Sequence, residues 1–293
     1  MLTKNKIKNA ARHALHPTLL SAIQGLRGLW YVPDPQVSIL RDSFEQLNEG
    51  SPQDSIVMRR GVTFRIGHDS REPFQWFCWK SPTMVQEFDR FLEVRGKYRR
   101  FLDLGANHGV YSLAFVAGRP DAESVAVDPS PLAFPILLSN VSANAAHIQC
   151  LQLAAGDQDG QLRMKLNWHH LEVIPDQSGG ETKTIKIVPV RKMDDVCMEL
   201  GFIPDLVKVD VEGFELAALR GLERILTSYR PVVFLEIHHD LIRALGYSAS
   251  ALTKFAATVD YHFENLKGEH LSFAFIEDQI GGTVSSGLHT PSR

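Results

Sequence analysis

Residues 101–109 read FLDLGANHG, and VYSL follows at residues 110–113. An apolar strand here runs into a turn with two glycines and then into a helix. Gly105 and Gly109 allow a tight turn and let a ligand approach the backbone closely. The start of the following helix favours polar or anionic groups of that ligand. This stretch therefore predicts a ligand-binding loop at the first strand of an α/β sheet.

Short apolar strands alternate with helical stretches beyond this loop, which is typical of a parallel sheet in a doubly wound α/β fold. The predicted strands are 100–104, 124–128, 147–153, 206–210 and 232–237. Turn residues at Lys267-Gly268-Glu269 predict a final antiparallel hairpin, 261–266 with 271–276, that closes the sheet. We therefore expect a mostly parallel sheet with an antiparallel end.

Two further patterns lie inside this region. Residues 161–166 and 184–190 alternate like a hairpin inserted between the third and fourth strands. A helix is predicted after Gly213, and one of its faces carries Leu216, Leu219, Leu222, Ile225 and Leu226.

The regions around the sheet divide the chain into three parts. Residues 1–80 are expected to form a helical and β-hairpin extension, with the hairpin inside 56–80 and its turn at 67–69. Residues 81–280 are expected to form the main α/β domain, and the Gly-, Ser- and Thr-rich residues 281–293 a disordered tail.

The overall composition is that of a soluble globular protein. The 293 residues include 31 Lys and Arg against 34 Asp and Glu, a net charge of −3, so no nucleic-acid partner is expected. No apolar run approaches the roughly 20 residues that span a bilayer, and no secretory leader is recognisable, so we expect a cytoplasmic protein without a transmembrane segment. The three cysteines contain no CxxC pair, which argues against disulfides or structural zinc. The basic segment 1–33 is expected to pack on the domain or on a second subunit of a homo-oligomer.

The glycine-bearing turn differs from a dinucleotide site. A dinucleotide fingerprint needs glycine at positions 107 and 110, where the sequence has Asn107 and Val110. Asp103 at the strand end would repel a pyrophosphate but would accept hydrogen bonds from an amino acid's ammonium. S-adenosylmethionine carries such an ammonium and no phosphate. We therefore expect Asp103, Gly105, Asn107 and Gly109 to bind S-adenosylmethionine, and an NAD(P)-dependent oxidoreductase is the weaker alternative.

Two further carboxylates extend this expected cofactor site. Asp128 closes the second strand about 20 residues after the glycine turn, the spacing at which an acidic residue binds ribose hydroxyls. Asp157 follows the third strand and is expected to accept a hydrogen bond from the adenine amino group. Simple turn chemistry in the surrounding Gly156–Gly160 is the alternative for Asp157.

The ends of the fourth and fifth strands carry the expected catalytic groups. Side chains two residues apart on a strand share a face, so Lys208 pairs with Asp210 and Glu236 with His238. His238 is the first candidate for a general base, because an unperturbed histidine has a pKa of about 6.5. Glu236 or Asp210 would orient it or take the proton directly, and Lys208 would form an ion pair with a carboxylate.

A divalent metal such as Mg²⁺ is an alternative to a purely organic site. Asp210, Glu236 and His238 offer two carboxylates and an imidazole at neighbouring strand ends. Hard oxygen ligands suit Mg²⁺ better than imidazole does. We therefore assign these residues to catalysis and none to a metal.

Four blocks of sequence together resemble the FkbM family of methyltransferases. They are DLGANHG at 103–109, DP at 128–129, KVDVEGFE at 208–215 and LEIH at 235–238. The third block is the most specific, whereas many methyltransferases share the glycine turn. The resemblance covers roughly residues 85 to 265 and leaves the first 80 outside it.

The resemblance implies a Rossmann-like class I methyltransferase fold and methyl transfer from S-adenosylmethionine. In this family the acceptor is usually an oxygen of a small molecule or glycan, and a cofactor-binding module without turnover is a further alternative. Two departures stand out. The second-strand carboxylate is usually Glu but is Asp128 here, and Pro135 falls within the helix expected after that strand.

Overall fold

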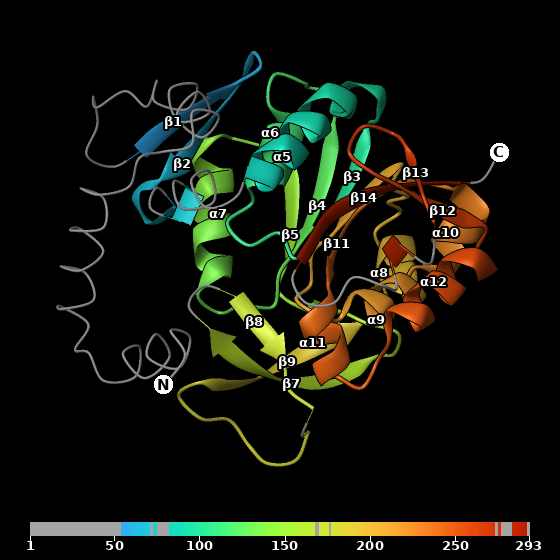
Figure 1. Ribbon diagram of the computed structural model, residues 1–293. Coiled ribbons are helices and arrows are strands. Elements are labelled where there is room, and N and C mark those ends of the chain that lie inside the picture. The colour runs from blue at the N-terminus through green and yellow to red at the C-terminus, as the bar shows by residue number, and fades with distance from the viewer. Residues whose placement is uncertain are drawn as a thin grey trace, which may run out of the picture. The chain divides into compact units, whose positions relative to one another are not determined.

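The computed structural model describes residues 54–70, 73–74, 82–167, 170–175, 177–272, 275–276 and 283–291 (Figure 1). They lie within one compact unit, Arg41–Arg293. The expectations for the basic segment 1–33, and for an oligomer built through it, lie outside the described residues. Within those residues, no helix has both the length and the apolar character to cross a membrane.

The main feature of the described residues is an eight-stranded sheet. In spatial order its strands are β13 (His270–Leu271), β12 (Tyr261–Glu264), β14 (Thr283–Pro291), β11 (Val232–His238), β10 (Leu206–Val209), β3 (Arg100–Leu104), β4 (Glu123–Val127) and β5 (Ile148–Leu151). The last five run parallel to one another, whereas β14 runs antiparallel to both β11 and β12. This confirms the predicted Rossmann-like, mostly parallel sheet with an antiparallel end.

The antiparallel end of the sheet contains the predicted hairpin and one further strand, β14, which lies next to the parallel strands. Strands β12 and β13 do pair as a hairpin. However, Thr283–Pro291 inserts between β12 and β11. The expectation of a disordered tail over 281–293 is therefore wrong for these nine residues. The many Gly, Ser and Thr residues give this segment no alternating apolar pattern that would predict a strand. The strand is instead stabilised by main-chain pairing to distant segments.

Helices cover both faces of this sheet. They are α5 (Pro82–Val94), α6 (Val110–Val116), α7 (Ala133–Ala143), α8 (Met193–Glu199), α9 (Glu215–Arg220), α10 (Glu223–Tyr229), α11 (His239–Ala244) and α12 (Ala249–Thr258), with a 3₁₀ turn, η1 (Arg95–Lys97), after α5. On one face, apolar side chains of α8, α9, α10 and α12 pack against alternate strand residues such as Leu102 and Leu235. On the other, α5 and α6 bring Phe91 and Phe115 against Phe101, and Phe91 also meets Phe234.

One proline and one glycine explain details of these helices. Pro135 lies in the first turn of α7, where a missing N–H costs no hydrogen bond, so the helix neither starts late nor breaks there. The single helix predicted after Gly213 is two helices, α9 and α10, with a break at Gly221 and Leu222. A Cβ on Gly221 would lie 2.0 Å from the carbonyl oxygen of Gly156, so this close approach admits only glycine.

The N-terminal hairpin has its turn earlier than predicted. Strands β1 (Asp54–Arg59) and β2 (Val62–Gly67) pair antiparallel around Arg60 and Gly61. Both turn residues have positive φ, 49° and 77°, which suits a two-residue hairpin turn. The expected turn at 67–69 is therefore wrong, because Arg60 is an unusual residue at such a position.

The insertion forms a second, smaller sheet. Its strands are β6 (Ala154–Ala155), β9 (Ile185–Arg191), β7 (Gly160–Asn167) and β8 (His170–Val173), in that order. The antiparallel pairing of β7 with β9 confirms the predicted hairpin, and β8 adds a strand that the sequence did not suggest.

Candidate functional site

The glycine-bearing turn joins β3 to α6 and is held against the end of β10. Gly105 has a φ of 82°, and a Cβ there would lie 1.7 Å from the backbone oxygen of Asp210. Asn107 has a φ of 49°, which asparagine tolerates better than most residues. Gly109, at a φ of 82°, precedes α6, and a Cβ on it would meet Leu137 at 2.4 Å. The turn therefore needs glycine at both predicted positions for packing as well as for conformation.

Asp128 anchors this turn from the end of β4. Its carboxylate accepts hydrogen bonds from the backbone N–H groups of Asn107 at 2.7 Å and Ser130 at 2.8 Å. Burial raises the pKa of Asp128 to about 7, although the two N–H donors favour the ionised form. Sequence analysis predicted that Asp128 belongs to the cofactor site, and in the structure its carboxylate contacts the backbone of Asn107.

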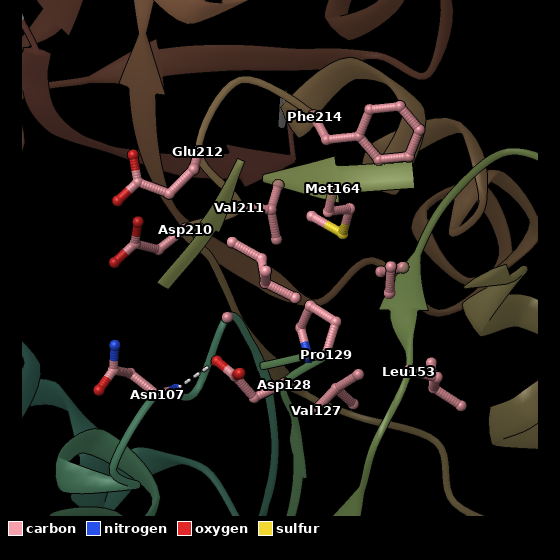
Figure 2. A pocket seen from close by; sticks show the side chains of 14 residues that line it. Asn107, Val127, Asp128, Pro129, Leu153, Met164, Asp210, Val211, Glu212 and Phe214 are labelled. Carbon is pink, nitrogen blue, oxygen red and sulfur yellow. Dashed lines mark hydrogen bonds between the residues drawn. The ribbon is translucent and has the colours of Figure 1, made fainter. Parts of the chain in front are cut away.

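A cavity opens beside Asp128, between the central sheet and the insertion. It encloses about 610 Å³ of space free of atoms, a figure that includes its open mouth. Figure 2 shows Asn107 and Asp128 at one end and Met164 and Phe214 at the other. The lining residues are Gly105, Asn107, Val127, Asp128, Pro129, Leu153, Ala154, Ala155, Met164, Leu171, Asp210, Val211, Glu212 and Phe214.

The apolar wall of the cavity was not anticipated. Met164 on β7 and Leu171 on β8 come from the insertion, and Phe214 precedes α9. Phe214 belongs to the motif at 208–215, but nothing in that motif indicates an apolar wall, and the places of Met164 and Leu171 depend on how the second sheet packs. For Met164, the alternation within the predicted strand 161–166 indicates that one face of the insertion is apolar.

Three of the predicted cofactor residues lie outside the described lining. Asp103 is 1% exposed and accepts a 2.7 Å hydrogen bond from Ser112 of α6. Burial raises the pKa of Asp103 to about 6, against the opposing effects of Lys208 and Ser112. The carboxylate of Asp157 lies 3.9 Å from the guanidinium of Arg220, and Gly109 packs against α7.

Lys208 is buried in the middle of the polar group that continues behind the cavity. Its ammonium lies 2.7 Å from Oδ2 of Asp210 and over the ring of Tyr111, 4.7 Å from the centroid. Tyr111 in turn donates to Glu87 of α5 at 3.1 Å. Burial alone would lower the pKa of Lys208, but the carboxylates of Asp210, Glu87, Glu236 and Asp103 outweigh it and raise the pKa. Lys208 therefore holds Asp210 in place as a buried cation.

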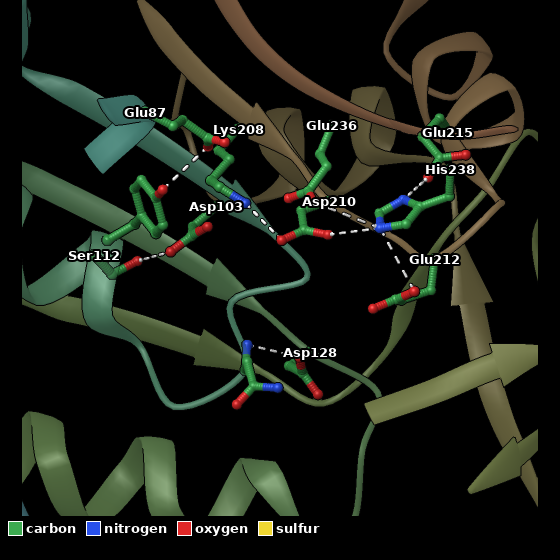
Figure 3. A network of polar contacts seen from close by, with 12 residues as sticks. Glu87, Asp103, Ser112, Asp128, Lys208, Asp210, Glu212, Glu215, Glu236 and His238 are labelled. Carbon is green, nitrogen blue, oxygen red and sulfur yellow. Dashed lines mark hydrogen bonds and ion pairs between the residues drawn. The ribbon is translucent and has the colours of Figure 1, made fainter. Parts of the chain in front are cut away.

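His238 is fixed by a carboxylate on one side and faces carboxylates on the other. Its Nδ1 lies 2.7 Å from Oε1 of Glu215, a fully buried residue at the start of α9. Its Nε2 lies 3.5 Å from Glu212 and 3.8 Å from each of Asp210 and Glu236 (Figure 3). The structure thus brings together the predicted catalytic set of Lys208, Asp210, Glu236 and His238.

The charges of this set depart from ordinary values. Burial lowers the pKa of His238, but the hydrogen bond to Glu215 and the nearby carboxylates outweigh it and raise that pKa to about 10. Burial and the charge of Asp210 raise the pKa of Glu236. For Asp210, burial opposes ionisation, yet Lys208 and His238 lower its pKa. In this arrangement the imidazole is cationic at neutral pH, unlike the neutral base that an unperturbed histidine would provide.

Glu87, Ser112 and Glu215 are members of the polar group that sequence reasoning did not assign to the site. Glu87 and Ser112 come from helices on the same face as Asp103 and Lys208. Glu215 opens a helix, which by itself indicates a favourable charge–dipole interaction. Its contact with His238 joins residues from two elements, so the sequence spacing alone does not reveal it.

Comparison with known proteins gives a family match over most of this site. The model of the methyltransferase FkbM domain matches residues 103–263. A curated relative, methyltransferase sdnD of Sordaria araneosa, is 27% identical over 156 residues, which are 42% of this chain and 60% of the relative. The match therefore spans less than two thirds of that protein's length.

Solved structures give likenesses of low sequence identity. The methyltransferase FkbM of Methylobacillus flagellatus KT is 19% identical, with a TM-score of 0.42, over 66% of this chain and 43% of that one. M. jannaschii TYW2, solved in complex with AdoMet, is 12% identical, with a TM-score of 0.42, over 82% of this chain and 86% of that one. A SAM-dependent methyltransferase of Agrobacterium tumefaciens is 14% identical, with a TM-score of 0.43, over 83% of this chain and 71% of that one.

Proposed function

Because the chain belongs to the FkbM methyltransferase family, we propose that it transfers the methyl group of S-adenosylmethionine to a hydroxyl of a small molecule or glycan. One observation carries the proposal. The cavity that contains Asp128 at one end is bordered by Asp210, the foremost member of the polar group at the ends of β10 and β11. A cofactor site and a candidate site for the chemistry are therefore contiguous.

The residues around the cavity suit this cofactor. Asp128, next to the Asn107 backbone, is placed to accept hydrogen bonds from the ribose hydroxyls. Met164 and Phe214 offer an apolar surface for the adenine ring. The carboxyl groups of Asp128 and Asp210 line the cavity, and its lining contains no Lys or Arg side chain that would pair with a phosphate. Such surroundings favour a ligand with an ammonium and a sulfonium over a dinucleotide.

The chain's own contribution to the reaction follows from Asp210. When bound, S-adenosylmethionine supplies an electrophilic methyl group on a positively charged sulfur. Asp210 lines the cavity, whereas Glu236 and His238 are only 8% and 9% exposed behind it. We therefore assign Asp210 to the contact with the acceptor hydroxyl, whose proton it would accept. Lys208 positions Asp210, and Glu215 positions His238.

A labelled-methyl transfer assay tests this proposal. The protein would be incubated with S-adenosylmethionine that carries an isotopic label in its methyl group and with panels of hydroxylated metabolites and glycans. We expect label on an oxygen of one acceptor class, with loss of turnover but not of cofactor binding in Asp210→Asn. Transfer to nitrogen or carbon would contradict the acceptor assignment. Cofactor binding without transfer to any acceptor would instead indicate a module without turnover.

A further inference from the structure

The space between Asp210, Glu236 and His238 has the dimensions of a cation site. Each residue offers one ligand atom, and these atoms lie within 4.8 Å of one another. The imidazole Nε2 is 3.8 Å from Oδ1 of Asp210 and 3.8 Å from Oε1 of Glu236, distances too long for hydrogen bonds. Ligand atoms that share a cation at about 2.1 Å lie roughly 3 to 4 Å apart. The spacing around Nε2 therefore suits a shared cation.

The orientation of His238 is an independent observation that points the same way. Its Nδ1 is fixed at 2.7 Å by Glu215, whose Oε1 also accepts the backbone N–H of Gly213 at 2.9 Å. A metal-binding histidine almost always donates its other ring N–H to such a partner, which fixes the ring and its tautomer. Here the fixed ring directs Nε2 at the carboxylates, as Figure 3 shows.

Asp210 connects this cluster to the cavity. Lys208 contacts Oδ2 of Asp210 at 2.7 Å, which leaves Oδ1 on the side of His238. Asp210 and Glu212 line the cavity, so a cation held here would face it. Glu212 Oε2, 3.5 Å from the same Nε2, lies near enough to take part as a fourth ligand.

We propose that Asp210, Glu236 and His238 bind one divalent cation of the Mn²⁺ type. The Nε2 proton of the cationic imidazole is released to solvent as the cation binds. Carboxylates suit Mg²⁺ and Mn²⁺ and imidazole suits transition metals, so Mn²⁺ accepts both parts of this set. The open side of the cation faces the cavity and binds the acceptor oxygen, whose proton becomes easier to remove beside the positive charge. This last role rests on the proposed function, whereas the cation site itself does not.

Calorimetric titration of chelator-treated protein with MnCl₂ alone tests the site. We expect one Mn²⁺ per chain, at least tenfold weaker binding in Glu236→Gln and His238→Gln, and weakening of about 10- to 100-fold in Glu215→Gln. The control is Glu123→Gln, which alters an exposed carboxylate that pairs with Arg100 outside the cluster, and it should bind like the parent. Circular dichroism would establish that each variant is folded.

Two results would overturn the site. Folded parent protein that binds none of Mn²⁺, Mg²⁺ and Zn²⁺ excludes it, and so do cluster variants that bind Mn²⁺ as tightly as Glu123→Gln does. A parallel titration with S-adenosylhomocysteine separates this proposal from the proposed function. If S-adenosylhomocysteine binds but no cation binds, only the proposed cation site is ruled out. If the cation binds but S-adenosylhomocysteine does not, only the proposed methyl transfer is ruled out.

Discussion

At the scale of single residues, Asp128 connects the glycine-bearing turn to the expected ribose position. It is 6% exposed and accepts the Asn107 N–H, so the carboxylate both shapes the turn and faces the cavity. Its placement follows from sequence spacing, since an acidic residue that ends the second strand must lie beside the first turn. The Glu215–His238 contact does not follow from spacing, because two separately packed elements create it.

Substitution Asp128→Ala should weaken S-adenosylhomocysteine binding by about 10- to 100-fold, since it removes hydrogen bonds to a charged group worth about 1.5–3 kcal/mol each. Isothermal titration calorimetry measures this change. Asp121→Ala is the control, because Asp121 is an exposed carboxylate near Arg99 and far from the cavity lining. Unchanged affinity in the Asp128 variant would refute the ribose assignment.

The raised pKa of Asp128, about 7, predicts a pH dependence of cofactor binding. Two ribose hydroxyls donate best to an ionised carboxylate, so binding lowers the pKa of Asp128 and releases a proton. Affinity for S-adenosylhomocysteine should therefore rise between pH 6 and 8 and level off above the pKa of the unbound protein. The slope should vanish in Asp128→Asn, and an equal slope in that variant would assign the effect to another group.

At the scale of elements, α7 connects the N-terminal hairpin to the cofactor turn. Asn140 accepts the Gly67 N–H at 2.8 Å and donates to the His108 carbonyl at 2.8 Å and to Ser70 at 2.8 Å. One turn later, Asn144 bonds both backbone groups of Arg65. The hairpin is thus attached to the helix, and through Asn140 to the turn that the cofactor would meet.

This arrangement predicts different effects for two neighbouring asparagines. Asn140→Ala leaves buried polar groups without partners, so it should lower the free energy of unfolding by about 1–3 kcal/mol and weaken S-adenosylhomocysteine binding several-fold. Asn144→Ala, the matched control, should loosen the hairpin but keep the parent's affinity. Chemical denaturation and calorimetry measure the two quantities. Equal affinities in both variants would show that Asn140 does not position the turn.

Element boundaries were predictable where the apolar pattern is local. The strand predicted at 100–104 is β3, Arg100–Leu104, and the fifth strand differs from its prediction only by His238. The hairpin turn at Arg60 and Gly61 was not predictable, because arginine rarely occupies a position with positive φ. The contact that requires glycine at 221 was not predictable either, because it is made with the carbonyl oxygen of the distant Gly156. Long-range packing also decides the cavity wall that Met164 provides.

At the scale of the whole molecule, β14 completes the central sheet from the end of the chain. It pairs with β11 over residues Val233–His238 and with β12 over Tyr261–Glu264. Strand β11 carries Glu236 and His238, so the strand that a composition argument treats as a tail supports the site. Without β14, the edges of β11 and β12 that it pairs with would be left unpaired.

Deletion of residues 281–293 should therefore destabilise the protein strongly. Loss of the main-chain hydrogen bonds of a central strand should lower the thermal midpoint by roughly 10 °C or more and promote association through the exposed edges. Removal of Ser292 and Arg293 alone is the control, since β14 ends at Pro291. Thermal denaturation and gel filtration measure both effects, and a truncated protein as stable as the control would argue against the strand.

The proposal that this molecule uses S-adenosylmethionine is tested most directly by calorimetric titration with S-adenosylhomocysteine, with NADH as the comparison ligand. We expect one S-adenosylhomocysteine to bind per chain and no heat of binding from NADH, because the turn offers Asn107 and Asp128 instead of a pyrophosphate cradle. Binding of NADH in place of S-adenosylhomocysteine, or of neither ligand to folded protein, would contradict the assignment of the cofactor and with it the proposed methyl transfer.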